Sequence, residues 1–184
     1  IRGEAGSFPL DRNTVRRIGR SLAKRMAERL GREPKFITGR DTRESGSWIE
    51  TEFSLGAASA GAVCHSAGVI TTPGVAFVTG EFDRDLGVVV SASHNPYLDN
   101  GLKAFLPTGR KIDEELERLV ESDIAALQNG QPEADGFDLD LSREAEFRTA
   151  YLKHLLGSTR GLRLDGFKIA VDCANGAACH LAPE

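Results

Sequence analysis

The chain alternates between a spacing of hydrophobic residues typical of helices and one typical of buried strands. Apolar residues recur at steps of three and four over residues 11–31, which predicts an amphipathic helix. Asp11 or Asn13 is placed to cap its start and Gly31 to end it. Residues 88–90 are all valine, as in a strand buried on both faces. Helical and strand patterns follow one another, so the predicted class is α/β.

The same spacing predicts the remaining elements. Strands are expected at Lys35–Thr38, Val69–Ile70, from Gly87 and at Leu102–Phe105, and helices at Ser47–Ala67, Gly74–Thr79, after Asp113 and at Ser142–Leu156. The small residues of 56–62 permit close approach of their helix to a sheet. Residues 128–136 are rich in Gln, Asn, Gly and Pro and predict an exposed connection. We expect a mixed, mostly parallel sheet of about four strands sandwiched between helices.

A polar loop directly follows the three valines. It places Ser93, His94 and Asn95 beyond the carboxyl end of a strand, where ligand sites of α/β sheets gather. Asp99-Asn100-Gly101 predicts a tight turn, because Asn and Gly tolerate positive φ. The strand after this turn should run antiparallel to the one before it, since the loop is too short for a parallel crossover. Lys103, just past the turn, can bring a cation back toward Ser93.

Two chemistries are open to a serine in this loop. A hydrolase would need His94 as the base of Ser93, but adjacent side chains of an extended segment point to opposite sides, and no Gly-x-Ser-x-Gly elbow is present. A phosphoryl carrier fits better, because loop amides, Asn95, Lys103 and Arg2 could supply donors and positive charge. Lys103 is the candidate proton handler or phosphate partner. His94 either binds substrate or holds the loop.

A second polar loop, residues 39–46, also lies between a strand and a helix. Arg40 and Arg43 can brace a neighbouring anionic loop through bidentate bonds. The alternative is an internal ion pair between Asp41 and Arg43.

Composition excludes several classes of protein. The 184 residues are 40% hydrophobic and 27% charged, as in an ordinary soluble globular protein. A net charge of −4 with scattered basic residues argues against nucleic acid and anionic lipid, and no apolar run approaches the roughly 18 residues of a membrane span. The odd number of cysteines, three, with no CxxC spacing, indicates neither a disulfide framework nor a zinc site and favours a reducing cytoplasm. Cys64 and His65 are interpreted as a core cysteine beside a surface histidine on a helix.

Several stretches carry a resemblance to a known family. Ser-Ala-Ser-His-Asn-Pro with Asp-Asn-Gly-Leu-Lys, together with Gly-Arg-Asp-Thr-Arg-Glu-Ser-Gly and Arg2-Gly3, resembles the α-D-phosphohexomutases. The Asp-Asn-Gly version is most similar to the bacterial branch that acts on glucosamine phosphates. Branches acting on mannose or glucose phosphates are the nearest alternatives, and a catalytically silent binding module that kept the fold is an alternative of another class.

The resemblance implies a mechanism and cofactors. Ser93 would be phosphorylated and would exchange its phosphate with a phosphosugar through a hexose or hexosamine 1,6-bisphosphate. Mg²⁺ would be held by the phosphate on Ser93 and by aspartates of a D-G-D-G-D-R loop that this sequence lacks. Arg2, Asn95, Arg40 and Arg43 are the candidate phosphate-binding residues.

The resemblance also implies the domain organisation. Residues 1–140 would form the first domain, which bears the phosphoserine loop. Residues 141–184 would be a connecting helix and the start of a second, similar domain, with a buried strand at 167–172. The expected partners are a phosphosugar, the family's domains 2 to 4 on the same polypeptide, and a possible second copy in a homodimer.

Overall fold

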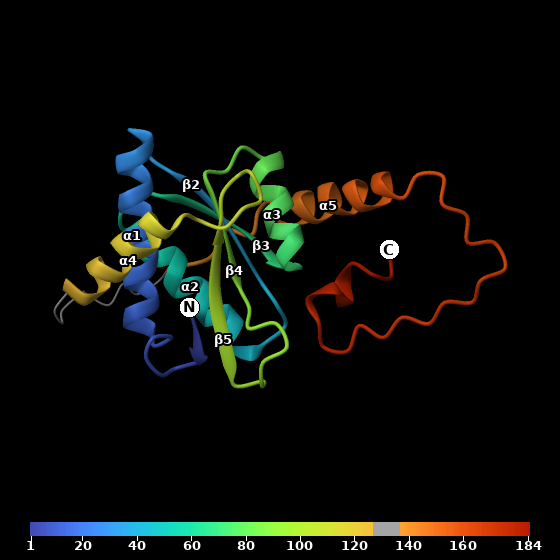
Figure 1. Cartoon of the computed structure of the whole chain (residues 1–184), viewed down its shortest axis with the longest axis horizontal. Helices are drawn as coiled ribbons and strands as arrows, with labels where there is room; N and C mark the ends of the chain where they lie inside the picture. Colours follow the sequence, from blue (N-terminus) through green and yellow to red (C-terminus); the bar gives the residue numbers. More distant parts are fainter. Residues whose placement is uncertain (127–136) are drawn as a thin grey trace.

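The computed structural model describes residues 1–126 and 137–184, in which five strands form one mixed sheet with helices on both faces (Figure 1). The strands are β1 (Arg2–Glu4), β2 (Lys35–Arg40), β3 (Val63–Val69), β4 (Leu86–Val90) and β5 (Asp99–Phe105). Their order across the sheet is β1-β5-β4-β2-β3. β2 is parallel to β3 and β4, whereas β5 is antiparallel to β4 and β1. The predicted mixed sheet and the antiparallel last strand are confirmed.

The helices divide between the two faces of the sheet. They are α1 (Arg12–Leu30), α2 (Glu44–Ala58), α3 (Thr72–Glu81), α4 (Glu114–Ala126) and α5 (Glu144–Ser158), with a short 3₁₀ helix at Ala177–His180. α1, α2 and α4 share one hydrophobic core with the sheet, and α3 and α5 share another on the opposite face. None of the helices in the described ranges is long and apolar enough to cross a membrane.

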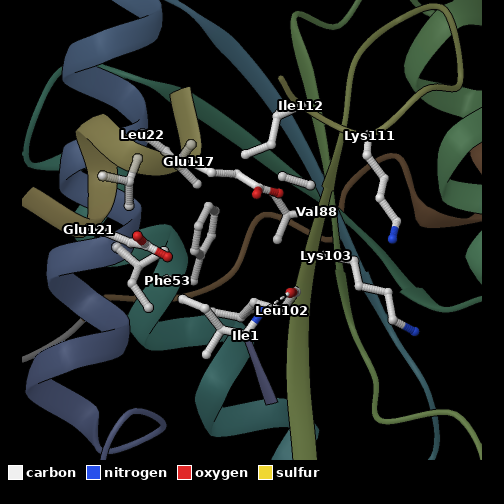
Figure 2. A pocket seen from close by; sticks show the side chains of 13 residues that line it. Ile1, Leu22, Phe53, Val88, Leu102, Lys103, Lys111, Ile112, Glu117 and Glu121 are labelled. Carbon is white, nitrogen blue, oxygen red and sulfur yellow. Dashed lines mark hydrogen bonds between the residues drawn. The ribbon is translucent and has the colours of Figure 1, made fainter. Parts of the chain in front are cut away.

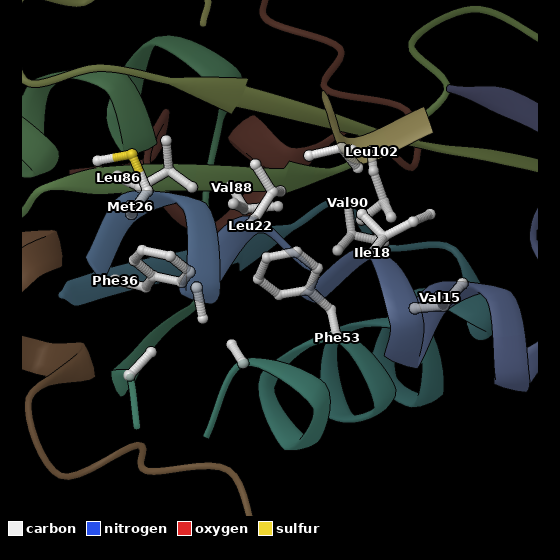
Figure 3. Packing of buried hydrophobic residues seen from close by; sticks show 14 of the residues in the cluster. Val15, Ile18, Leu22, Met26, Phe36, Phe53, Leu86, Val88, Val90 and Leu102 are labelled. Atoms are coloured by element: carbon white, nitrogen blue, oxygen red, sulfur yellow. The ribbon is translucent and has the colours of Figure 1, made fainter. Parts of the chain in front are cut away.

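β4 is buried on both faces, as its valine run predicts. Val88 and Val90 pack with α1 and α2, where Leu22 and Phe53 lie beside them (Figure 3). Val89 faces the second core, between α3 and α5. The Asp11 side chain accepts a hydrogen bond from the Thr14 amide, 3.0 Å, and so caps α1 as one of the two predicted candidates.

Glycine brings α1 and α2 into backbone contact. A Cβ atom on Gly56 would collide with the carbonyl of Arg16, and one on Gly19 with the carbonyl of Phe53. Gly56 therefore serves a helix–helix contact, not the helix–sheet approach that was predicted. Arg16 and Glu52 form an ion pair of 2.7 Å across this contact.

The predicted helix at 47–67 is wrong in its second half. α2 ends at Ala58, Gly61 adopts a left-handed φ of 85°, and Val63 begins the parallel strand β3. The sequence of this segment is compatible with a helix or a strand, because its residues are small and show no strong periodicity. Pairing with β2 makes it a strand. Cys64 and His65 consequently lie on a strand. Burial raises the pKa of the Cys64 thiol to about 12.

Residues 167–172 are not the buried strand that was predicted. Phe167, Ile169 and Val171 are 71%, 63% and 68% exposed, and the segment forms part of a long irregular excursion beyond α5 (Figure 1). The described residues offer this segment no strand to pair with, and an unpaired strand leaves its backbone groups unsatisfied. The predicted exposed connection at 128–136 lies outside the described residues.

Candidate active site

The loop between β4 and β5 presents Ser93 to solvent in an unusual backbone conformation. Ser93 is exposed and has a φ of 57°, in the left-handed region that few residues other than glycine adopt. The hydroxyl of buried Ser91 accepts a hydrogen bond from the Ser93 amide, 3.1 Å. The Asn95 amide donates to the Ala92 carbonyl, 3.1 Å. Such local strain tends to be kept at functional positions, where it fixes the direction of one side chain.

Lys103 reaches the Ser93 hydroxyl from the neighbouring strand. It lies on β5 opposite Val89, and its Nζ is 3.0 Å from Ser93 Oγ. This approach was expected from the position of Lys103 just past a predicted turn, and the contact is present although the turn lies earlier in the chain. The described part of the chain gives the His94 side chain no hydrogen-bond partner, so the serine is paired with an amine and not with an imidazole.

Asp99-Asn100-Gly101 is not the predicted turn but the first part of β5. These residues pair with β1, with Arg2 opposite Gly101. The reversal of direction occurs earlier, within residues 93–98, where Asn95 Nδ2 donates to Asp99 Oδ2 at 2.9 Å. Asn100 is fully buried and donates to Ser45 Oγ at 2.9 Å, which ties the strand to α2. The turn was misplaced because β1 is too short and too polar to be recognised as a strand.

Arg43 binds the backbone of the serine loop. Its two terminal nitrogens donate to five backbone carbonyl oxygens of the loop, those of Ser93, Asn95, Pro96, Tyr97 and Asp99. Its Nε donates to Asp41 Oδ2 at 3.2 Å, and only 10% of the side chain is exposed. The sequence left two roles open for Arg43, an ion pair with Asp41 and contact with the neighbouring loop. The structure contains both: Asp41 binds the guanidinium at Nε, and the terminal nitrogens face the loop.

The Arg40 side chain pairs with a buried acid. Its Nε is 3.2 Å from Glu50 Oε2. Glu50 is fully buried, accepts hydrogen bonds of 2.6 Å from the Thr38 and Ser66 hydroxyls, and joins α2 to β2 and β3. Burial raises the pKa of Glu50, against the opposing effect of these partners. Arg40 thus fixes the start of the loop at residues 40–43, and Arg43 lies at the end of this loop.

Positive charge surrounds the Ser93 hydroxyl. Burial, followed by the positive charge of Arg2, lowers the pKa of Lys103; Lys111 acts in the same direction and Asp41 in the opposite one. A lysine with a lowered pKa exchanges its proton more readily near neutral pH. The arrangement can neutralise an oxyanion on Ser93 and handle a proton there.

A cavity of about 710 Å³ opens in front of the loop. It is lined by Arg43, Ser91, Ser93 and Asn95 on one side and by residues 174–177 on the other. The Thr42 hydroxyl donates to the carbonyl of Asn175, which connects the two walls. A second, largely apolar pocket of about 200 Å³ lies on the other side of β5, beneath α1 and α4 (Figure 2). The cavity at the loop is the one that has polar groups converging on the serine.

The described residues do not by themselves form a magnesium site. Mg²⁺ takes oxygen ligands in near-octahedral geometry. Within residues 1–126 and 137–184 no group of three or more acidic, histidine or cysteine side chains could hold a metal ion. Of the acids near the loop, Asp41 is paired with Arg43, and Asp99 accepts a hydrogen bond from Asn95. A phosphate on Ser93 would add oxygen ligands here.

A sheet between two helical layers, with a strained serine at the carboxyl end of β4 and an amine on its hydroxyl, defines an α/β/α domain of phosphohexomutase type. Residues 1–131 match the family described as phosphoglucomutase/phosphomannomutase, alpha/beta/alpha domain I, and the chain belongs to this family.

Two relatives that match nearly the whole chain are phosphoglucosamine mutases. A phosphoglucosamine mutase of Solibacter usitatus is 47% identical over all of this chain and 40% of its own length, and one of Koribacter versatilis is 40% identical over 99% of this chain and 40% of its own. The chain therefore spans about two fifths of the relatives that it matches.

Solved structures support the fold. A putative phosphomannomutase of Thermus thermophilus matches 86% of this chain and 34% of its own, with a TM-score of 0.71 and 23% identity. The phosphoprotein parafusin of Paramecium, a phosphoglucomutase, matches 97% of this chain with a TM-score of 0.62 and 18% identity.

Proposed function

We propose that this chain is the phosphoserine-bearing part of a phosphoglucosamine mutase, which interconverts glucosamine 6-phosphate and glucosamine 1-phosphate. The observation that carries the proposal is the 3.0 Å contact between Lys103 Nζ and the exposed Ser93 hydroxyl. The names of the relatives support the choice of sugar. The activity is proposed for the whole polypeptide, since the chain covers only part of its relatives.

The proposed step is transfer of a phosphoryl group from Ser93 to a sugar hydroxyl. The P–O bond to Ser93 Oγ breaks, a P–O bond to the sugar oxygen forms, and the proton of the sugar hydroxyl ends on Ser93 Oγ. We propose that Lys103, whose Nζ is 3.0 Å from Ser93 Oγ, passes this proton and neutralises charge on the moving group. In the reverse sense, the resulting 1,6-bisphosphate returns its other phosphate to Ser93.

The remaining site residues divide into binding and positioning roles. Arg2 and Asn95 are proposed to bind the phosphate, and His94, exposed beside Ser93, to contact the substrate. For Arg43 we propose a positioning role through the loop carbonyls, and for Arg40 a role at the base of the same segment.

The wider organisation is proposed on the same basis. Residues 1–140 would be domain 1 and residues 141–184 the link to domain 2. Mg²⁺ would act in the complete enzyme, with its other ligands outside this chain. The enzyme would work in the cytoplasm. It would form a homodimer, for which the exposed side chains of Tyr97 and Leu98, at 61% and 65%, offer apolar surface.

Incubation with glucose 1,6-bisphosphate tests the proposal. The full-length polypeptide, purified without phosphatase, should gain the mass of one phosphate, and peptide mapping should locate it on Ser93; this chain is expected to be inactive by itself. Ser93→Ala should abolish the gain, and Lys103→Met should slow it by about 10²-fold or more, because a positioned proton handler contributes about that much. The exposed Ser47→Ala on α2 is the matched control and should behave as wild type.

Two results would refute the proposal. One is the absence of phosphate on Ser93 both as purified and after incubation, which is the outcome expected for a catalytically silent binding module. The other is an equal rate of labelling for Lys103→Met and wild type.

A further inference from the structure

A row of three cations runs along one face of β5. Gly101, Lys103 and Phe105 occupy alternate positions of this strand and so share a face. On the flank of β5 away from β4, Arg2 lies opposite Gly101, and Lys111 lies opposite Phe105. Residues directly opposed in an antiparallel pair point to the same face. Arg2, Lys103 and Lys111 therefore project from one surface, with Lys103 in the middle.

The absence of a side chain at Gly101 leaves space for Arg2 on this face. A Cβ atom on Gly101 would lie 3.0 Å from Arg2 Cγ, so the missing side chain leaves the space that the Arg2 stem occupies. Figure 2 shows the amines of Lys103 and Lys111 directed to the same side of β5, away from the apolar side chains of the pocket beneath α1 and α4. The charges thus gather on the face that carries Ser93 Oγ.

These cations have no anion of their own in the described part of the chain. No ion pair formed by residues 1–126 or 137–184 includes Arg2, Lys103 or Lys111. Asp41 is the acid that acts on Lys103, and its carboxylate is bound by Arg43. Like charges held together without a counter-charge repel one another, and a bound anion relieves that repulsion.

We infer that Lys111 is a further phosphate-binding residue of this site, and that the row binds the dianion of a phosphate monoester beside Ser93. A dianion placed over Lys103 meets Arg2 on one side and Lys111 on the other. The inference rests on the proposed function for its place in a reaction. The test uses inorganic phosphate, which binds without any transfer to Ser93. The phosphate site and the proposed phosphoryl transfer can therefore fail separately.

Titration of the chain with inorganic phosphate, followed through the backbone amide NMR signals of Ser93 and Lys103, gives the dissociation constant. Lys111→Ala should weaken binding about two- to fivefold, the range expected for one partly exposed charge pair. Lys111→Arg should keep the wild-type affinity. Arg110→Ala is the matched control: it removes one positive charge at the neighbouring exposed position, which takes no part in the pairing of Lys111 with Phe105, and should not change the affinity.

Three results would overturn the inference: no phosphate binding by the wild-type chain, equal affinity in Lys111→Ala, or equal weakening in Arg110→Ala, which would reveal a diffuse effect of net charge. If the weakening is specific to Lys111 while no phosphate is ever found on Ser93, the anion site stands and the proposed transfer falls.

Discussion

Replacement of Arg43 tests whether one side chain holds the serine loop in its strained form. Arg43→Ala removes the donors to five loop carbonyls and leaves the Asp41 carboxylate without its partner. The two terminal nitrogens carry about four hydrogens, so the five acceptors share about four bonds. At about 0.5–1.5 kcal/mol of net stabilisation for each bond, and with part of the loop free to rehydrate, the expected loss is about 2–4 kcal/mol.

Thermal unfolding and hydrogen exchange together measure this loss. For a chain of this size about 3 kcal/mol corresponds to a fall in Tm of about 6–12 °C. The loop amides, those of Ser93 and Asn95 above all, should exchange faster than those of β4, because the lost bonds are local. Arg43→Lys should recover little, since an ammonium cannot reproduce the fork of the guanidinium.

Arg118→Ala provides the matched control. Arg118 is 77% exposed and pairs with Glu114 on the surface of α4, so its loss should change Tm by about 1 °C at most. The reasoning is refuted if Arg43→Ala melts within about 1 °C of wild type and its loop amides exchange at the wild-type rate.

Three further predictions concern single positions. Gly101→Ala should destabilise the protein by about 1–3 kcal/mol in urea unfolding, because the new Cβ lies 2.8–3.0 Å from two backbone oxygens and from Arg2 Cγ; an unchanged midpoint would contradict the close packing of β5. Burial raises the pKa of Glu50, so the stability it contributes is present below its ordinary value of 4.5 and is lost as pH rises through the raised value. The advantage of wild type over Glu50→Gln in urea should therefore shrink as the pH is raised above 4.5, and a growing advantage would show the opposite shift. Cys64, with a pKa of about 12, should stay unlabelled by iodoacetamide in the folded protein at about pH 8, whereas labelling at the rate of the unfolded chain would show that its thiol is accessible.

The serine loop was predictable because its signals are local. A valine run, a polar break and a lysine at a fixed distance along the chain place Ser93 and Lys103 within reach of each other, and the structure confirms that contact. The α1 helix and its Asp11 cap were predictable for the same reason, since a helix closes its hydrogen bonds within itself.

Pairing between distant segments was not readable in the same way. β3 and the start of β5 exist because β2 and β1 lie beside them, and a strand has no hydrogen-bonded structure without its neighbour. The same dependence explains why residues 167–172, alternately apolar but unpaired, form no strand.

The sequence by itself determined the α/β class and the residues, Ser93 and Lys103, that meet at the loop. Only the tertiary structure decided that Arg43 serves the loop backbone, that Arg40 turns to Glu50, and that Lys111 joins Arg2 beside Lys103. These roles depend on the register of the strands and on which polar groups are buried. Both are set by contacts between segments far apart in the chain.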